Sequence, residues 1–544
     1  MSQQGGRSRE WDFIDIGPKS VGDHSSQRIA PPPETSAVLQ DTPPAPQASI
    51  RADGADIPAP PPWAHEIIQG GMGAGVSGWK LARAVSLTGH LGVVSGLGLD
   101  VMVTRQLQRG DPTGDYRRAL AHFPIPRIAQ QVIDRYFVEG GIGEGAPFRA
   151  IPQLVVHPSR ESAQLAVVTN FAEIFLAKEG HDGSIGVNYL EKTQMATPAV
   201  VYGAMLAGVD YVLMGAGVPA EIPNLLDAFA SGREGELTLA VHGGDAATAP
   251  SVSFSPESIL GYAPPLARPR FLAIVSSTML ATYLSREDRT RPDGFVVEGI
   301  SAGGHSAPPR GRLRLEDDGQ PAYGPRDAVE LATVRALGLP YWLAGGYSSP
   351  ERLLEAKQTG AAGVQVGSAF ALCAESGLVP AIRRSLRTAA TARTLRVHAD
   401  PRASPTGFPF KVAHLNGTLS DEAVYAERSR VCDVGYLRTP YRTASGRIGY
   451  RCPAEPIDDF VRKGGLPADA VDRRCLCNGL VSAIGLGQRL EDGATEPPIV
   501  TIGHDLTFLP HLIGDGDGAD EYSAQQVIDY LTGTAGPVGT GTKS

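Results

Sequence analysis

The sequence predicts an α/β fold, a TIM (β/α)8 barrel with a disordered N-terminal leader and an irregular, cysteine-containing C-terminal extension. Short apolar runs that end in Gly, Ser or Asn alternate with helical stretches from about Trp63 onward. Each run is continuously apolar, as expected for a parallel strand that is covered on both faces. Eight such repeats favour a closed barrel, and a doubly wound sheet is the structural alternative.

Three segments follow from the composition: a leader over residues 1–60, the barrel over 61–380 and the extension over 381–544. Ten prolines lie between Pro31 and Pro62, mixed with Ala, Ser, Gln and Asp. A segment of this kind buries too little apolar surface to offset its ordering entropy, so we expect it to be disordered. A docking tail is the alternative.

Eight strands are predicted from the apolar runs. In chain order they are Glu66–Gln69, Leu91–Ser95, Ser184–Asn188, Tyr211–Met214, Phe271–Ser276, Gly294–Glu298, Tyr341–Ala344 and Gly363–Val366. Helical patterns follow most of them, namely Pro198–Ala207, Met279–Leu284, Asp327–Ala336 and Pro350–Thr359. Two longer excursions interrupt the repeats. The first carries helical stretches around Arg127–Glu139 and Ser162–Lys178, and the second a probable hairpin at Leu237–Val241.

The charge and hydropathy of the chain exclude several classes of partner. The formal net charge is −9 and no long basic run occurs, which argues against nucleic acid or an anionic membrane as the main partner. No apolar run reaches the ~18 residues of a membrane span. Met1–Ile16 lacks the apolar core of a signal peptide, so we expect a cytoplasmic protein.

Gly73, Gly75 and Gly78 form the pattern G-x-G-x-x-G, which is typical of a dinucleotide-binding turn. Ser77 is a candidate N-cap for a helix that begins at Gly78. A dinucleotide site also needs an acidic residue at the end of the next strand. That strand ends in Ser-Gly-Leu-Gly, and no acid appears before Asp100. The glycines therefore favour a βα unit of another α/β fold.

Two glycine-terminated strands predict a phosphate site. In a barrel of this type, the loops after strands seven and eight hold phosphate through backbone N–H groups. Gly345 and Gly346 follow the seventh predicted strand, and Gly367 and Ser368 follow the eighth. Ordinary βα turns are the alternative interpretation of these residues.

A single histidine, His305, follows the sixth predicted strand in the stretch EGISAGGHSAPPRG. A histidine at the mouth of a barrel can act as a general base near neutral pH. A structural role for a lone histidine is the alternative.

Four stretches together resemble the nitronate monooxygenase (2-nitropropane dioxygenase-like) family of FMN-dependent barrels: IIQGGMGAGVS, IGVN, VVEGISAGGHSAPPRG and LAGGYSSPERLLEAKQTGAAGVQVGSAF. They span about Pro62 to Ala374. The resemblance implies that Gln69, Gly70, Gly71 and Met72 lie along the flavin ring with Asn188. It implies that Gly345, Gly346, Gly367 and Ser368 hold the FMN phosphate, with Gly303 and Gly304 in the site. His305 matches the family's catalytic histidine.

The chain departs from the family at one strand end. Relatives often carry a lysine near the flavin where the fifth strand ends, and here Ser276 and Ser277 stand in its place. The departure leaves open how the chain stabilises the negative charge that gathers on a reduced flavin.

The extension carries Cys432, Cys452, Cys475 and Cys477. Four thiolates could hold zinc or an iron–sulfur cluster, although the spacing is not that of common metal sites. Ordinary thiols are the alternative interpretation.

We expect an FMN-dependent oxidoreductase that oxidises nitronates or nitroalkanes with O2 to carbonyl compounds and nitrite. The alternatives are a flavin-dependent enoyl reductase of the trans-acting fatty acid or polyketide type, which uses NAD(P)H, and a flavin-binding accessory subunit of a synthase. The partners expected are a small-molecule substrate and either further copies of the chain or a synthase.

Overall fold

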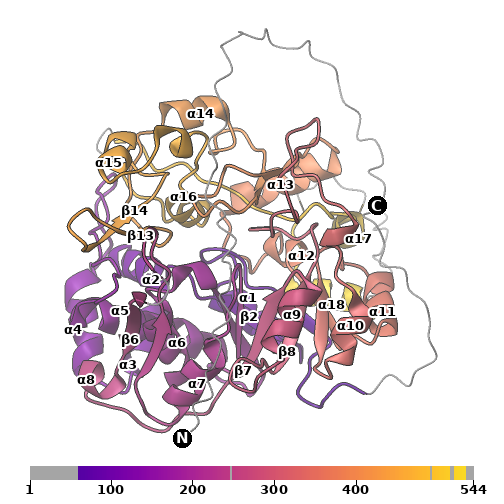
Figure 1. The fold of residues 1–544 in the computed structure, drawn as a ribbon, viewed down its shortest axis with the longest axis horizontal. Coiled ribbons are helices and arrows are strands. Elements are labelled where there is room, and N and C mark those ends of the chain that lie inside the picture. Colours follow the sequence, from indigo (N-terminus) through magenta and orange to yellow (C-terminus); the bar gives the residue numbers. More distant parts are fainter. Residues whose placement is uncertain (1–58, 246–247, 491–492, 515–519, 535–544) are drawn as a thin grey trace, which may run out of the picture. The chain divides into compact units, whose positions relative to one another are not determined.

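A single sheet of eight parallel strands forms the centre of the protein. The computed structural model describes residues 59–245, 248–490, 493–514 and 520–534. The strand order is β1-β10-β9-β8-β7-β4-β3-β2. These strands are β1 (Ile67–Gln69), β2 (Gly92–Ser95), β3 (Ile185–Leu190), β4 (Tyr211–Gly215), β7 (Arg270–Val275), β8 (Gly294–Glu298), β9 (Tyr341–Ala344) and β10 (Gly363–Val366). Each lies within two residues of its predicted range, so the α/β barrel is confirmed (Figure 1).

The barrel closes between its first and last strands in the sheet order. Ile68 and Leu91 form a parallel bridge that joins β1 to the start of β2. The Gln69 backbone N–H donates to the Leu91 carbonyl at 2.9 Å, and the Leu91 N–H donates to the Ile67 carbonyl at 3.1 Å. The sheet therefore has no free edge at this seam.

The apolar strands supply two cores, one on each side of the sheet. Side chains alternate between the faces of a strand, so neighbouring residues enter different cores. In β8, Val296 lies in the cluster that fills the barrel interior, while Phe295 and Val297 pack against the surrounding helices. Trp342 of β9 also lies in the interior cluster. This double burial explains why the strands are continuously apolar in sequence.

Helices cover the outside of the barrel. They are α1 (Trp79–Ser86), α2 (Leu99–Gln108), α3 (Asp115–Ala121), α4 (Pro126–Tyr136), α5 (Arg160–Lys178), α6 (Thr197–Leu206), α7 (Ile222–Ala230), α8 (Pro256–Leu260), α9 (Thr278–Leu284), α10 (Leu331–Ala336), α11 (Pro350–Gln358) and α12 (Ser368–Ala371). The predicted N-cap at Ser77 is wrong. Gly78 is the N-cap of α1, and the Ser77 hydroxyl instead accepts a hydrogen bond from the Met72 N–H at 2.7 Å. It therefore braces the turn after β1.

The predicted hairpin of the second excursion is present with a longer loop. β5 (Gly235–Thr238) pairs antiparallel with β6 (Ser251–Phe254) outside the barrel sheet. The hairpin was predicted within Leu237–Val241, as two strands joined by a tight turn. In the structure a longer loop separates the two strands, so the second strand begins only at Ser251.

The chain leaves the barrel after α12 and returns to it at the end. The intervening elements are α13 (Pro380–Thr391), β11 (Val397–Asp400), β12 (Phe410–Ala413), α14 (Glu422–Glu427), β13 (Thr439–Arg442), β14 (Ile448–Arg451), α15 (Ile457–Arg462), α16 (Leu476–Ala483) and α17 (Leu509–Ile513). Most of the extension, residues 381–508, lies above the strand ends in Figure 1. The last helix, α18 (Ala524–Thr532), packs against α1 and α11. It thereby completes the ring of barrel helices between its first and last members.

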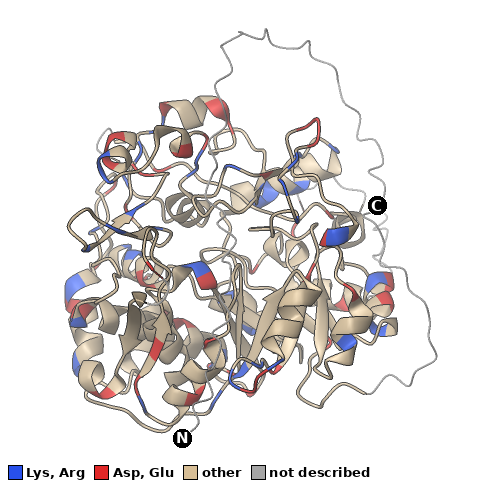
Figure 2. Ribbon diagram, viewed as in Figure 1, with Lys and Arg blue, Asp and Glu red and all other residues tan. Residues whose placement is uncertain are grey.

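Figure 2 shows basic and acidic residues interspersed along the outer helices. No helix in the described parts of the chain has the length and apolar character needed to cross a membrane. The predicted leader falls almost entirely on residues 1–58, outside the described residues.

Candidate active site

Two adjoining hollows open at the carboxyl ends of the barrel strands. The first, which we call the glycine-rich hollow, reaches the loops after β9 and β10, and the second, the apolar hollow, reaches beneath the extension. They share Gly71, Gly73, Glu298, Gly303, Gly304, Gln365 and Thr501, so they form one continuous cavity. Their volumes, counted with their open mouths, are about 880 and 1080 Å³. Cofactor and small-molecule sites of parallel barrels lie at this end of the strands.

The residues predicted to hold phosphate line the glycine-rich hollow. They are Gly345, Gly346, Gly367 and Ser368. Gly345 and Gly346 have φ values of 86° and 77°, a conformation that favours glycine. A Cβ atom on Gly346 would lie 3.2 Å from Oγ of Ser301. The bare backbone of this turn therefore forms part of the cavity wall, as an anion held by N–H groups would require.

The predicted ring-contacting residues lie in the cavity, with one exception. Gly70, Gly71 and Met72 line the glycine-rich hollow, and Asn188 lines the apolar hollow. A Cβ atom on Gly71 would lie 2.3 Å from Cβ of Asn188, so only glycine lets β1 approach β3 at this point. The exception is Gln69, which is fully buried and lines neither hollow.

Gln69 instead holds the barrel seam. Its Oε1 accepts a hydrogen bond from the Val93 N–H at 3.0 Å, and its Nε2 donates to the Val93 carbonyl at 3.2 Å and the Gly70 carbonyl at 2.5 Å. The Gln69 side chain thus links β1 to β2 through hydrogen bonds to the Val93 backbone. The expected contact of Gln69 with the flavin ring stays a prediction, and its side-chain polar atoms are hydrogen-bonded within the sheet.

Gln365 carries a polar atom that has no partner within the described chain. Its side chain lines both hollows from β10, and its Oε1 is buried without a hydrogen bond. A buried acceptor of this kind is costly unless a ligand supplies a donor. Sequence reasoning missed Gln365 because it lies inside a strand rather than in a strand-end loop.

His305 lines the apolar hollow, together with Gly303 and Gly304. Its Nε2 lies 2.7 Å from Oγ of Ser404, so Nδ1 is the nitrogen left to exchange a proton with a molecule in the cavity. Its ring packs edge-on against Phe410, with 4.9 Å between ring centroids. Burial, and next the charge of Lys192, lower the pKa of His305 to about 4. The imidazole is therefore neutral at pH 7 and a weaker base than an ordinary histidine.

Glu298 is a second titratable group in the cavity, at the end of β8. Its carboxyl group lines both hollows. Burial raises the pKa of Glu298 to about 7, and the charge of Lys411 opposes the rise. The sequence analysis did not predict Glu298, because it considered the residues that follow each strand. Glu298 is the last residue of its strand, and an acid at that position was a usable signal.

The extension forms an apolar ceiling over the second hollow. Phe410, Val434, Leu437, Leu476, Leu480 and Val481 line the apolar hollow from β12, α16 and the loops between them. Among the described residues that line the two hollows, none is Lys or Arg. The ceiling could not be predicted, because irregular loops of the extension give no periodic signal that places them above the barrel.

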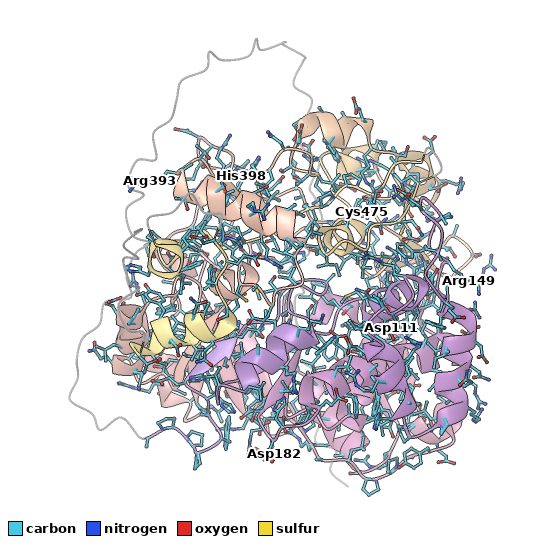
Figure 3. The ribbon with its side chains drawn as sticks, turned by 180° about the vertical axis from the view of Figure 1, so that it is seen from behind. Asp111, Arg149, Asp182, Arg393, His398 and Cys475 are labelled. Atoms are coloured by element: carbon cyan, nitrogen blue, oxygen red, sulfur yellow. The ribbon has the colours of Figure 1, made fainter. Side chains whose placement is uncertain are left out.

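The four cysteines of the extension do not form a metal site in this structure. Within the described residues, no group of three or more His, Cys, Asp or Glu side chains is placed to hold a metal ion. Cys452 and Cys475, the second labelled in Figure 3, pack with Ala454 in a small apolar cluster. Burial raises the pKa of all four thiols, that of Cys477 to about 12. The prediction of zinc or an iron–sulfur cluster at Cys432, Cys452, Cys475 and Cys477 is therefore not supported, and protonated thiols fit the arrangement.

Several solved structures resemble the fold at low similarity. FabK of Thermotoga maritima is 16% identical with a TM-score of 0.40, over 86% of this chain and 91% of that one. The enoyl reductase domain of MlnA from Bacillus amyloliquefaciens is 12% identical with a TM-score of 0.44, over 86% and 93%. Nitroalkane oxidase from Streptomyces ansochromogenes is 16% identical with a TM-score of 0.38, over 86% and 95%. Scores this low tie the chain to none of their activities.

Sequence comparison gives a more specific result. Over 152 residues the chain is 34% identical to a nitronate monooxygenase of Pseudomonas aeruginosa, and the matched stretch covers 27% of this chain and 42% of that protein. The chain thus matches less than half the length of this curated relative. Residues 270–402, which run from β7 past β10, match the model of the family described as nitronate monooxygenase. The resemblance predicted from the motifs is therefore confirmed, and it is the second half of the barrel that matches the nitronate monooxygenase family model.

Proposed function

We propose that the protein is an FMN-dependent oxidoreductase whose cofactor binds in the cavity at the barrel mouth. The observation that carries the proposal is the lining of that cavity. Bare glycine turns line one hollow, and Gln365, whose buried Oε1 has no hydrogen-bond partner within the described chain, lines both. A flavin offers a phosphate for the glycine turns and a ring N–H group for the amide oxygen. When bound, it would supply reversible uptake of electrons.

Different residues would hold the phosphate and the ring of the flavin. Gly345, Gly346, Gly367 and Ser368 would surround the phosphate, which backbone N–H groups and hydroxyls must hold because the lining offers no Lys or Arg. Gly71, Asn188 and Gln365 would face the ring from β1, β3 and β10. These residues orient the ring toward the apolar hollow, where His305 and the ceiling lie.

The first candidate reaction is oxidation of nitronates or nitroalkanes by O2, because the matching family is named for it. His305 would take the α-proton of a neutral nitroalkane through Nδ1, while Ser404 holds the ring in place through Nε2. The neutral imidazole can accept this proton. The apolar ceiling would exclude water from the reacting carbon.

The second candidate is reduction of a carbon–carbon double bond in an acyl substrate by NAD(P)H. The specific observation that favours it is the ceiling itself. Six apolar side chains of the extension line the hollow, and no Lys or Arg lines it among the residues that the structure describes. A small anionic nitronate gains little from such a surface, whereas a neutral substrate with an apolar chain buries area against it.

One anaerobic experiment separates the candidates. The purified, flavin-loaded protein is mixed with NADH, with NADPH, or with a nitronate, and the visible absorbance of the flavin is followed. Rapid bleaching by a nicotinamide cofactor supports the reductase, and bleaching by the nitronate alone supports the oxygenase. If neither reductant bleaches a bound flavin, the accessory-subunit hypothesis gains support. If the protein contains no flavin and binds none on reconstitution, the proposed function is wrong.

A further inference from the structure

Glu298 occupies a position in the cavity that the proposed reactions do not use. It ends β8, lines both hollows and so stands where they meet. Within the described chain, the one interaction of its carboxyl group is with the charge of Lys411. Asp505, the other acid in the lining, differs from it, because Asp505 accepts hydrogen bonds from Ser348 at 3.1 Å and Thr507 at 2.6 Å. Glu298 is therefore the carboxyl group of the cavity that is free to change its protonation.

Lys411 reaches this place from the extension. Its backbone N–H donates to the Gly304 carbonyl at 2.9 Å, which fixes β12 against the loop after β8. Its Nζ lies 2.5 Å from the Ile300 carbonyl and 2.8 Å from Nδ1 of His504. Because Nε2 of His504 lies 3.0 Å from the Val397 carbonyl and must donate to it, Nδ1 is the acceptor of a neutral ring. Both partners of the ammonium are thus acceptors, which fits its charged form.

Apart from Glu298 and Asp505, the titratable groups of the lining stay neutral near pH 7. Burial lowers the pKa of His305 to about 4, and it raises those of Tyr347 and Tyr436 above that of ordinary tyrosine and that of Cys477 to about 12. Lys411 and His504 line neither hollow. No Lys or Arg among the described lining residues can therefore balance a negative charge that appears in the cavity.

We propose that Glu298, which lines both hollows at the end of β8, takes up a proton when a flavin in this cavity is reduced. The inference rests on the proposed flavin cofactor. Two-electron reduction with uptake of one proton leaves an additional negative charge on the flavin ring. A like charge nearby disfavours an ionised carboxylate, so Glu298 binds one proton from solvent and the net charge of the cavity is unchanged.

The chemistry of the pair fits this role. The raised pKa of Glu298, about 7, leaves the carboxyl group partly ionised before reduction, so a modest further rise protonates it. Lys411 is a positioning residue, because its charge keeps the carboxyl group from being protonated too early. Its own pKa is lowered to about 7 by burial, and the charge of Glu298 opposes this shift. The two groups therefore titrate as a coupled pair, and each depends on the other for its charge.

Proton counting tests the proposal without relying on turnover. The FMN-loaded protein is reduced at an electrode through methyl viologen, a mediator that carries electrons without protons, in weakly buffered solution with a pH indicator. Near pH 7, where Glu298 is about half ionised before reduction, the unaltered protein should take up about half a proton more per flavin than the Glu298→Gln variant. Glu173→Gln is the matched control. Glu173 also has a pKa raised to about 7 by burial but lines neither hollow, so its removal should leave the proton count unchanged.

Lys411→Met provides an independent reading. Without the ammonium the pKa of Glu298 rises, so the extra uptake should disappear near neutral pH and return at a more alkaline pH. Equal proton counts in the unaltered protein and Glu298→Gln would overturn the proposal. If Glu298→Gln fails to hold FMN, the Lys411→Met curve decides, and an unshifted curve overturns it. A protein that binds no flavin would instead refute the proposed function.

Discussion

Nε2 of His305 lies 2.7 Å from Oγ of Ser404, so a residue of the extension orients the histidine at the end of a barrel strand. Ser404 is itself held, because its Oγ lies 2.8 Å from Oγ1 of Thr406 and accepts from the Thr406 N–H at 3.2 Å. One nitrogen of the imidazole is thus fixed by Ser404, and the residue lines the apolar hollow. The extension takes part in the site and does not merely cover it.

Replacing His305 by Asn should leave FMN bound and slow the turnover of neutral nitroalkanes by about 10²-fold, because an amide cannot accept the α-proton. A preformed nitronate has lost that proton already, so its oxidation should suffer much less. Steady-state rates on both substrates check this. With a pKa near 4, His305 should add no step to the rate profile between about pH 5 and 8. Equal losses on the two substrates would assign His305 to binding instead.

Replacing Gly346 by Val should abolish FMN binding while the fold persists. The added Cβ would enter the glycine-rich hollow 3.2 Å from Oγ of Ser301, in a backbone conformation that β-branched residues avoid. Gly338→Val is the matched control, because Gly338 has φ 72° and open space around it but lines neither hollow. Flavin content after gel filtration measures the difference. Full occupancy in Gly346→Val would reject the phosphate assignment.

Replacing Gln69 by Leu should destabilise the barrel more than it affects the flavin. The change leaves the N–H and carbonyl groups of Val93 without their side-chain partners, at a cost of about 1–3 kcal/mol for each buried group. Asn188→Leu should show the reverse pattern, with flavin lost and stability nearly kept. Denaturant unfolding and flavin titration of both variants compare the two effects. A Gln69→Leu protein of normal stability that lacks flavin would support the expected flavin contact of this residue.

The stability of the protein should depend on pH through Glu173. This buried carboxylate accepts hydrogen bonds from the Trp79 N–H at 2.8 Å and the Tyr116 hydroxyl at 3.1 Å, yet burial raises its pKa to about 7. Between the unfolded pKa and about 7 the folded state binds more protons, so its stability falls as pH rises through this window. Glu173→Gln should lack this loss, which amounts to about 3 kcal/mol at most. Thermal midpoints of both proteins from pH 4 to about 8 check the sign.

The five cysteines should behave as protonated thiols and not as metal ligands. All five are free in the structure, and burial raises their pKa values. A thiol reagent should react slowly with the native protein and with five groups after unfolding, since the thiolate is the reacting form. Elemental analysis should find no stoichiometric zinc or iron. One metal ion per chain, lost together with the slow reactivity on chelation, would restore the metal hypothesis.

The strands could be predicted because burial on both faces of the sheet requires unbroken runs of apolar residues. Val296 and Phe295 face opposite cores, yet both must be apolar. The glycine turns were visible for a related reason, since positions such as Gly345 need a positive φ. Strand burial and backbone conformation restrict the residue type at each position, so both can be recognised in a short stretch of sequence.

The rest of the site depends on contacts between segments that lie far apart in sequence. Nothing around Lys411 or Ser404 indicates that the one approaches Glu298 and the other His305. Gln69 shows the converse problem. Its place at a strand end suggested the cavity, but the side chain turns into the seam because the Val93 backbone offers it a donor and an acceptor.

The seam between β1 and β2 has a consequence for how the protein is made. β1 also pairs with β10, through Ile67 and Val364, so the first strand to leave the ribosome must wait for the last one. Until then one flank of β1 stays unpaired and open to other chains. Such long-range pairing slows folding, and a nascent barrel of this order depends on protection from aggregation during synthesis.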